Sequence, residues 1–184
     1  MSDFFESLLR AVYVGATAST LIAATPAMSE TRAIAVALAE PMIDWIAAKT
    51  EFLSYEHPNI MFVTAEWMAL RLGQSSMMAT PEALYGSATL TVYLLEEWSP
   101  ANIRHQSILL HELVHHLQIL NGAAVSCPAQ YNRLAYQLQF EWLNEHGISE
   151  PFEFLGITPA DVFVQSLCAD PWGSLNDFWT SSSF

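Results

Sequence analysis

The 184-residue chain has few basic side chains, 6 Lys and Arg against 19 Asp and Glu, which gives a formal net charge of −13. Nucleic acids and anionic membrane surfaces are bound through positive patches. The composition therefore argues against both as partners and favours solubility. Because 52% of the residues are hydrophobic, we expect one folded domain with a substantial core rather than a disordered chain.

Cysteine is also scarce, with only Cys127 and Cys168 present. Two cysteines this far apart do not resemble a zinc knuckle. In an exported protein an even number of cysteines suggests a disulfide, which here would join the segment around residue 127 to the C-terminal region. Two buried free thiols are the alternative.

Long apolar stretches are lacking except near the N-terminus, where residues 11–29 carry no charge. Ala27 and Ser29 are small residues at the two positions that signal peptidase inspects, so we predict a signal peptide over 1–29 with cleavage before Glu30. The acidic start of the chain speaks against this, and an anchor or a domain helix is the alternative. We expect export to the periplasm or medium, with no stable membrane anchor after cleavage.

One short segment, HELVH from His111 to His115, matches the H-E-x-x-H pattern. On a helix, residues four apart lie on the same face, so His111 and His115 can offer two imidazole nitrogens to one metal ion. Glu112 lies about 100° further round the helix and can reach a water molecule held by the metal. The pattern is typical of zinc-dependent peptidases, with Glu112 as the general base.

The residues around the motif predict a well-bounded helix. Ser99 is expected to be the N-cap, Pro100 the first helical residue, and Trp98 to pack on Ile103. Asn121-Gly122 is a typical helix end. The leucines form a buried stripe that excludes the two histidines: Leu109, Leu113, Leu117 and Leu120. The alternative is that the histidines are ordinary surface residues beside a chance glutamate.

A catalytic zinc site needs three protein ligands and one open position. The extended three-histidine pattern fails, because Gln118 and Asn121 stand where it requires glycine and histidine. We therefore expect the third ligand from the next helix, over 129–146. The candidates are Asn132, Glu141 and Glu145, with His116 and His146 as further possibilities. Asn132 and Glu141 are nine residues apart, half a turn out of phase, so they cannot both face the metal.

The motif segment from His111 to Gln118 resembles the zincin metallopeptidases. The region from Leu84 to Cys168 also resembles a family of small exported bacterial proteins that look like minimal gluzincins. The matching segments are Gln106–Leu110, Asn121-Gly122, Cys127-Pro128, Ala135–Gln139, Trp142-Leu143, Leu155–Ile157 and Cys168. The resemblance implies a glutamate ligand where this chain has Asn132, and it supports pairing Cys127 with Cys168.

Together these observations predict an α+β fold over 30–168, a zincin-like minimal domain with a C-terminal tail over 169–184. A small, mainly antiparallel sheet is expected to pack on the active-site helix and a second helix. Helices are expected over 30–50, with a kink or break at Pro41, over 65–72, and from Thr158 onward. Strands are expected at 59–64, 83–85 and 89–94, the last as an edge strand that pairs with an extended substrate.

The leading functional expectation is an exported, zinc-dependent metallopeptidase acting on a peptide or protein substrate. Zn²⁺ would be held by His111 and His115 with Asn132 or Glu141, and Glu112 would be the general base. Tyr136 and His146 are candidates to stabilise the oxyanion. The alternative is a degenerate zincin-like domain that binds a peptide or protein partner without catalysis, which the uncharged Asn132 suggests.

Overall fold

The computed structural model describes residues 26–53, 56–73 and 81–168. Residues 1–25 of the expected signal peptide, which was predicted over 1–29, and the tail over 169–184 lie outside the described residues. The expected cleavage point after Ser29 falls within the first turn of α1, which begins at Pro26. The elements in chain order are α1 (Pro26–Lys49), β1 (Asn59–Val63), α2 (Ala65–Arg71), β2 (Ala83–Gly86), β3 (Thr91–Leu95), α3 (Ile103–Leu120), the 3₁₀ turn η1 (Pro128–Gln130), α4 (Tyr131–Glu145), α5 (Pro151–Leu155) and α6 (Pro159–Ser166). None of the described helices is both long and apolar enough to cross a bilayer.

The three strands form one sheet in the order β1-β3-β2, and the α+β class is confirmed. β2 and β3 make the expected antiparallel hairpin, whereas β1 pairs with β3 in parallel. The sheet is therefore mixed rather than mainly antiparallel. Because β1 joins the far side of β3, the 89–94 segment lies in the centre of the sheet, and the prediction that it is an edge strand was wrong.

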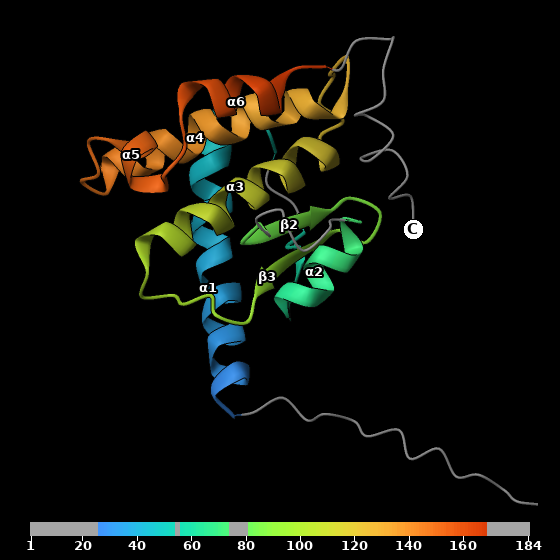
Figure 1. Ribbon diagram of the computed structural model, residues 1–184, viewed down its shortest axis with the longest axis vertical. Coiled ribbons are helices and arrows are strands. Elements are labelled where there is room, and N and C mark those ends of the chain that lie inside the picture. The colour runs from blue at the N-terminus through green and yellow to red at the C-terminus, as the bar shows by residue number, and fades with distance from the viewer. Residues whose placement is uncertain (1–25, 54–55, 74–80, 169–184) are drawn as a thin grey trace, which may run out of the picture.

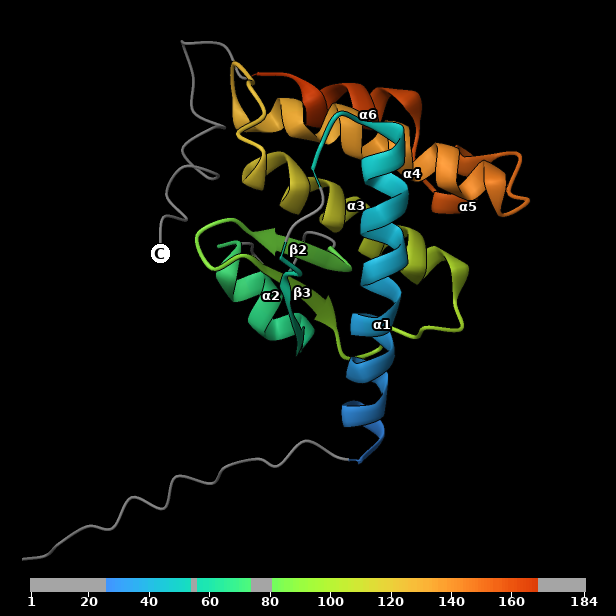
Figure 2. The ribbon, with the colours of Figure 1, turned by 180° about the vertical axis from the view of Figure 1, so that it is seen from behind.

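Both faces of this small sheet are covered. Val92 and Leu94 of β3 point into the main core, while Tyr93 packs with Met68 of α2 on the opposite face. Figures 1 and 2 show α3 running between the sheet and the layer formed by α4 and α6, with α1 crossing α3. Buried side chains from α1, β3, α3 and α4 together form the core around α3: Ile43, Ile46, Val92, Leu109, Leu113, Leu117, Leu138 and Leu143.

Helix α1 is a single element of 24 residues that continues through Pro41. Pro41 does not split the helix as the sequence suggested, because the proline lies on the exposed side and the flanking turns are fixed by burial. Its inward residues recur at helical spacing along one face: Ala35, Ala39, Met42, Ile43 and Ile46.

The motif helix α3 begins three residues later than expected. Asn102 is its N-cap, with Oδ1 accepting from the Arg104 N–H at 2.9 Å, so the prediction of Ser99 was wrong. Ser99 lies instead in a turn closed by the Asn102 N–H on its carbonyl, 3.1 Å. Asparagine caps as well as serine does, and the turn at Pro100 delays the start of the helix to Asn102. The end at Asn121-Gly122 is confirmed, with Gly122 at φ +59°.

Helices α4 and α6 complete the layer on the other side of α3. α6 begins at the expected signal, with a capping box between Thr158 and Asp161. The Cys127–Cys168 disulfide is confirmed, and it joins the residue before η1 to the segment that follows α6. Helices α4 and α6 therefore lie on the side of α3 that carries the histidine pair.

Candidate metal centre

The two motif histidines converge on one side of α3. Their ring centroids lie 4.8 Å apart and the ring planes are nearly perpendicular, at 81°. His111 is 9% exposed and His115 is half-buried, so the pair lies at the edge of the core and is open to solvent on the His115 side. This is the arrangement that a four-residue helical spacing predicts.

The Nδ1 atom of His111 is held by an amide oxygen from α4. It lies 3.0 Å from Gln139 Oε1, and Gln139 Nε2 donates to Ser107 Oγ at 3.2 Å. The Ser107 hydroxyl in turn donates to the Arg104 carbonyl at 2.8 Å, so its oxygen can accept from Gln139. Because the Arg104 carbonyl can only accept, it fixes which atom donates in each hydrogen bond of this series. His111 therefore carries its proton on Nδ1 and a lone pair on Nε2.

The same arrangement recurs at His115 with a partner on its own helix. Its Nδ1 lies 3.1 Å from Gln118 Oε1, and Gln118 Nε2 donates to the Tyr131 carbonyl at 3.1 Å. A carbonyl can only accept, so the glutamine oxygen faces the histidine, which must donate from Nδ1. Both imidazoles thus have a lone pair on Nε2, the protonation form that a metal ligand requires.

Of the candidates for the third ligand, the structure brings Asn132 to the histidine pair. Asn132 Nδ2 donates to the Gln165 carbonyl on α6 at 2.8 Å. The Asn132 side chain also interacts with both His111 and His115, and this contact opposes the lowering of their pKa values by burial. The Asn132 amide therefore lies beside both imidazoles, held from the other side by α6.

Burial controls the charge state of the metal-free centre. Loss of solvent, with a smaller contribution from the neighbouring His115, lowers the pKa of His111 to about 3, although the contacts with Gln139 and Asn132 oppose the shift. Burial also lowers the pKa of His115. Both imidazoles are therefore neutral at pH 7 and free of the proton that would compete with a metal ion.

Glu112 is 8% exposed and lies on the β2 side of α3. Burial raises the pKa of its carboxyl to about 8, and a hydrogen bond from the Tyr85 backbone N–H opposes that rise. β2 is the edge strand of the sheet, and the Tyr85 amide faces away from β3 toward Glu112. The motif glutamate is thus fixed to the sheet, and its pKa is of the kind found in functional carboxyls.

Tyr136 forms one wall of the centre. Its ring centroid lies 4.6 Å from that of His111, at an interplanar angle of 69°, and its hydroxyl donates to Gln165 Oε1 at 2.8 Å. Burial raises the pKa of Tyr136, and the nearby Glu112 raises it further. Gln165 of α6 therefore contacts two site residues, Asn132 through its backbone and Tyr136 through its side chain.

Glu141 and Glu145 are placed elsewhere. The ammonium of Lys49 on α1 lies 2.6 Å from a Glu141 oxygen and 2.7 Å from a Glu145 oxygen. Trp45 Nε1 also donates to Glu145 at 2.7 Å. α4 presents Asn132 to the histidines, and Glu141, half a turn out of phase, faces α1 instead. The structure does not support Glu141 or Glu145 as metal ligands.

The other two histidines considered as ligands also have other partners. His146 lies at the end of α4, about 21 Å along the helix from Asn132, with its Nδ1 2.7 Å from the Trp142 carbonyl. His116 is fully buried, with Nε2 2.7 Å from the Glu56 carbonyl and Nδ1 3.0 Å from the Tyr85 hydroxyl. His146 is therefore not brought to the site as an oxyanion donor, and His116 has no nitrogen left for a metal.

The donor set at the centre fits zinc in part. Within the described ranges there is no group of three or more His, Cys, Asp and Glu side chains that could hold a metal ion. What the structure provides is two imidazoles, which zinc prefers, and one neutral amide side chain, whose oxygen would bind it less strongly. Two ligand positions are therefore well formed, and the third is weak.

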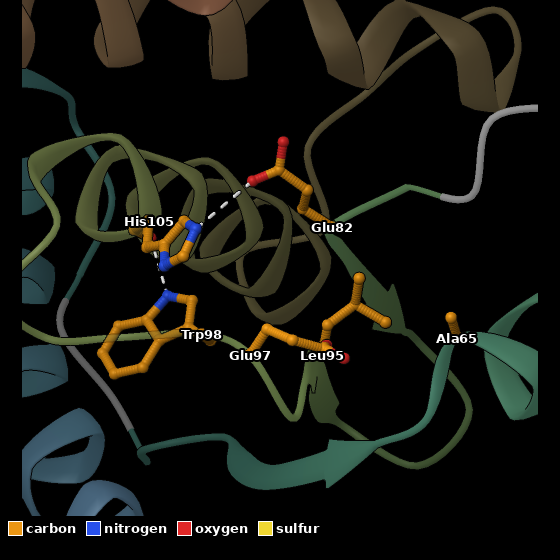
Figure 3. Close-up of a pocket in the computed structure, with 6 residues that line it drawn as sticks. All are labelled: Ala65, Glu82, Leu95, Glu97, Trp98 and His105. Atoms are coloured by element: carbon orange, nitrogen blue, oxygen red, sulfur yellow. Dashed lines mark hydrogen bonds and ion pairs between the residues drawn. The ribbon is translucent and has the colours of Figure 1, made fainter.

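Two hollows in the described surface lie away from the histidine pair. The first, of about 260 Å³, lies near the start of α3 and is lined by Ala65, Glu82, Leu95, Glu97, Trp98 and His105. Figure 3 shows Glu82 facing His105, with an oxygen 3.7 Å from Nε2, and Trp98 Nε1 donating to the His105 carbonyl at 2.8 Å. Glu82 is also paired with Arg104 at 2.8 Å. The second, of about 240 Å³, is lined by Gln118, by the connection between α3 and α4, and by residues of α4.

Sequence reasoning did not identify the three glutamines that organise the centre. Gln118 follows His115 by three residues and could have been found from helical spacing. Gln139 had a weaker signal, since it is a polar residue among the buried positions of α4. Gln165 had none, because its role depends on how α6 packs on α4.

The fold and the site define a small α+β domain in which two converging histidines and a buried glutamate lie between a mixed sheet and a helical layer. The chain belongs to the family described as a domain of unknown function (DUF6647), whose model matches residues 31–169. No curated protein and no solved structure matches the chain.

Proposed function

We propose that this chain is an exported zinc-dependent hydrolase of the metallopeptidase kind, with His111 and His115 as metal ligands and Glu112 as general base. The observation that carries the proposal is the pair of adjacent imidazoles, with ring centroids 4.8 Å apart, that both have a lone pair on Nε2. Each is left available because a glutamine oxygen holds the Nδ1–H of the same ring. Orienting groups of this kind usually accompany histidines that bind metals.

His111, His115 and Asn132 are the residues that would hold the ion. Zinc supplies positive charge, which acidifies a water molecule and polarises a substrate carbonyl. The amide oxygen of Asn132 is uncharged, so the site keeps more of the metal's positive charge than one with a carboxylate ligand, and it holds the ion less tightly. We therefore expect zinc binding that a strong chelator readily reverses.

Glu112 would carry the proton transfers. It follows His111 directly on α3, and the Tyr85 N–H fixes its carboxyl against the sheet. As general base it takes a proton from the attacking water, and as general acid it returns that proton to the departing amine. Tyr136, beside His111, is the candidate to stabilise the oxyanion once its hydroxyl turns from Gln165.

The choice of a peptide or protein substrate rests on the resemblance to zincins. The strand that was expected to pair with this substrate, 89–94, is hydrogen-bonded on both sides within the sheet, so it has no free edge for a substrate.

Export is supported by the Cys127–Cys168 disulfide, since disulfides persist mainly in oxidising compartments.

The test is the metal content and activity of the purified, oxidised chain. After dialysis against zinc we expect about one equivalent in the wild type and in His146→Ala, a matched control on α4, and none in His115→Ala. Glu112→Gln should keep the zinc and lose hydrolysis of a mixed peptide library. A wild type that holds no zinc, or a His115→Ala variant that holds as much as the wild type, would end the proposal.

A second candidate is a zinc-binding domain that holds a peptide or protein partner without cleaving it. The observation in its favour is that an amide, Asn132, stands at the third-ligand position. Asn132→Glu distinguishes the two candidates. A wild type that binds zinc but cleaves nothing, with hydrolysis appearing in Asn132→Glu, favours the non-catalytic reading. Hydrolysis by the wild type excludes it.

A further inference from the structure

Helix α6 is held only lightly by packing. It has eight residues, and none of them is fully buried. Three of the large apolar side chains in and after it face solvent, with exposed fractions of 64% for Phe163, 66% for Val164 and 48% for Leu167. An eight-residue helix is unstable in isolation, so α6 needs other constraints to stay in place.

Yet α6 provides both contacts that orient the outer side of the metal centre. Its Gln165 accepts from Asn132 Nδ2 through the backbone carbonyl and from the Tyr136 hydroxyl through the side chain, both at 2.8 Å. The first bond holds the Asn132 amide beside the histidines from the side of α6. Without it the side chain loses this partner and can turn about its torsions, which changes the group that it presents to the two imidazoles.

The disulfide supplies the missing constraint. Cys168 follows Gln165 by three residues, and its partner Cys127 lies immediately before η1 and α4, the helix that carries Asn132. The bond spans 41 residues of sequence. It thereby fixes the end of α6 beside the start of α4, where Asn132 lies, although the packing of α6 is thin.

We propose that Gln165 is the positioning residue of the metal centre and that the Cys127–Cys168 disulfide keeps it in place, so that opening the disulfide loosens the grip on the metal. The metal-binding part of this inference rests on the proposed function, whereas the orientation of Asn132 does not. Opening needs a dithiol reductant, which gives two electrons and two protons to the two sulfur atoms and becomes a disulfide itself.

The first experiment uses the metal-free, ¹⁵N-labelled full chain in chelator. The side-chain amide of Asn132 and the backbone amides of α6 are followed by NMR and hydrogen exchange, first oxidised and then with excess dithiothreitol. Reduction should speed exchange in α6 at least tenfold and shift the Asn132 amide signal, while the His111 Nδ1–H signal stays in place because Gln139 is not part of α6. An unchanged Asn132 signal would overturn the inference, whether or not the protein binds zinc.

The second experiment measures zinc affinity by chelator competition. Removal of an orienting partner typically costs 10–100-fold in metal affinity, so the chain with both Cys127→Ser and Cys168→Ser should bind zinc at least tenfold more weakly. If this double variant does not fold, Val164→Pro gives the same test, since it breaks α6 at an exposed position with the disulfide intact. Val164→Ala is its matched control and should bind zinc as the wild type does.

Ile46→Ala, a core variant in α1, separates these effects from a general loss of stability, because it removes none of the contacts of Gln165. It should lower the urea midpoint and leave zinc affinity within twofold of the wild type. The cobalt(II) absorption spectrum gives a further readout, because it responds to the ligands and not to overall stability. We expect it to change in Val164→Pro and to stay the same in Ile46→Ala. Equal zinc affinity and equal spectra in Val164→Pro and Val164→Ala would overturn the inference.

Discussion

Glu112→Gln should make the metal-free protein more stable at neutral pH. The carboxyl of Glu112 is buried, and its pKa is raised from 4.5 to about 8. A raised carboxyl pKa means that the folded state holds a proton that the unfolded chain releases. The resulting loss of folding stability is absent below pH 4.5, grows as the pH rises, and levels off above pH 8. At about 1.4 kcal/mol per pH unit it reaches roughly 3 kcal/mol at pH 7.

Glutamine has nearly the same shape and does not titrate. Its oxygen can still accept from the Tyr85 N–H, although its NH₂ group needs an acceptor that the carboxyl did not. We therefore expect a gain of about 1 to 3 kcal/mol at pH 7 and little or none at pH 4.5. A functional residue that lowers the stability of its own fold is a common result of selection for activity.

The assay is urea unfolding in chelator at a series of pH values from 4.5 to 8. His111 and the other titrating groups are the same in both proteins, so their contributions cancel in the difference. Glu145→Gln is the matched control, because that exposed carboxyl is paired with Lys49, its pKa is lowered, and its loss should give no gain. If the difference between Glu112→Gln and the wild type did not change with pH, Glu112 would not be protonated in the fold, and the reasoning about its burial would be wrong.

Three other predictions follow from the contacts. Gln139→Leu removes the acceptor of the His111 Nδ1–H and should weaken zinc binding about 10–100-fold, which chelator competition measures. Changing both Cys127 and Cys168 to serine releases a 41-residue loop and should lower the free energy of unfolding by about 4 kcal/mol, which urea titration measures; a loss near zero would contradict it. Lys49→Met breaks two solvent-screened ion pairs and should leave the urea midpoint almost unchanged, and a large shift would show that the pairs hold α1 on α4.

Features with local signals could be predicted from the sequence. The hairpin of β2 and β3, the α3 end at Gly122 and the capping box at Thr158 depend on residues within a few positions of one another. The α3 start was missed because Ser99 and Asn102 are both good caps, and the turn at Pro100 decides between them. The strand order was missed because the pairing of β1 with β3 is not local.

The third-ligand position also depends on tertiary packing rather than on local sequence. The sequence offered Asn132 and Glu141 half a turn apart, and it could not say which one faces the metal. The rotation of α4 decides this, because Ala135, Leu138 and Leu143 must be buried against α3 and the rest of the core. With that face fixed, Asn132 points toward the histidines and Glu141 toward Lys49.

The sequence by itself determined that His111, Glu112 and His115 share one side of a helix, because the geometry of a single helix relates residues three and four positions apart. Only the tertiary structure decided the state of those residues. The proton on His111 Nδ1, the contact that fixes the Glu112 carboxyl and the placement of the Asn132 side chain depend on Gln139, Tyr85 and Gln165, which come from three other elements. Those contacts exist only once the core has packed, since no local rule brings residues so far apart in sequence together.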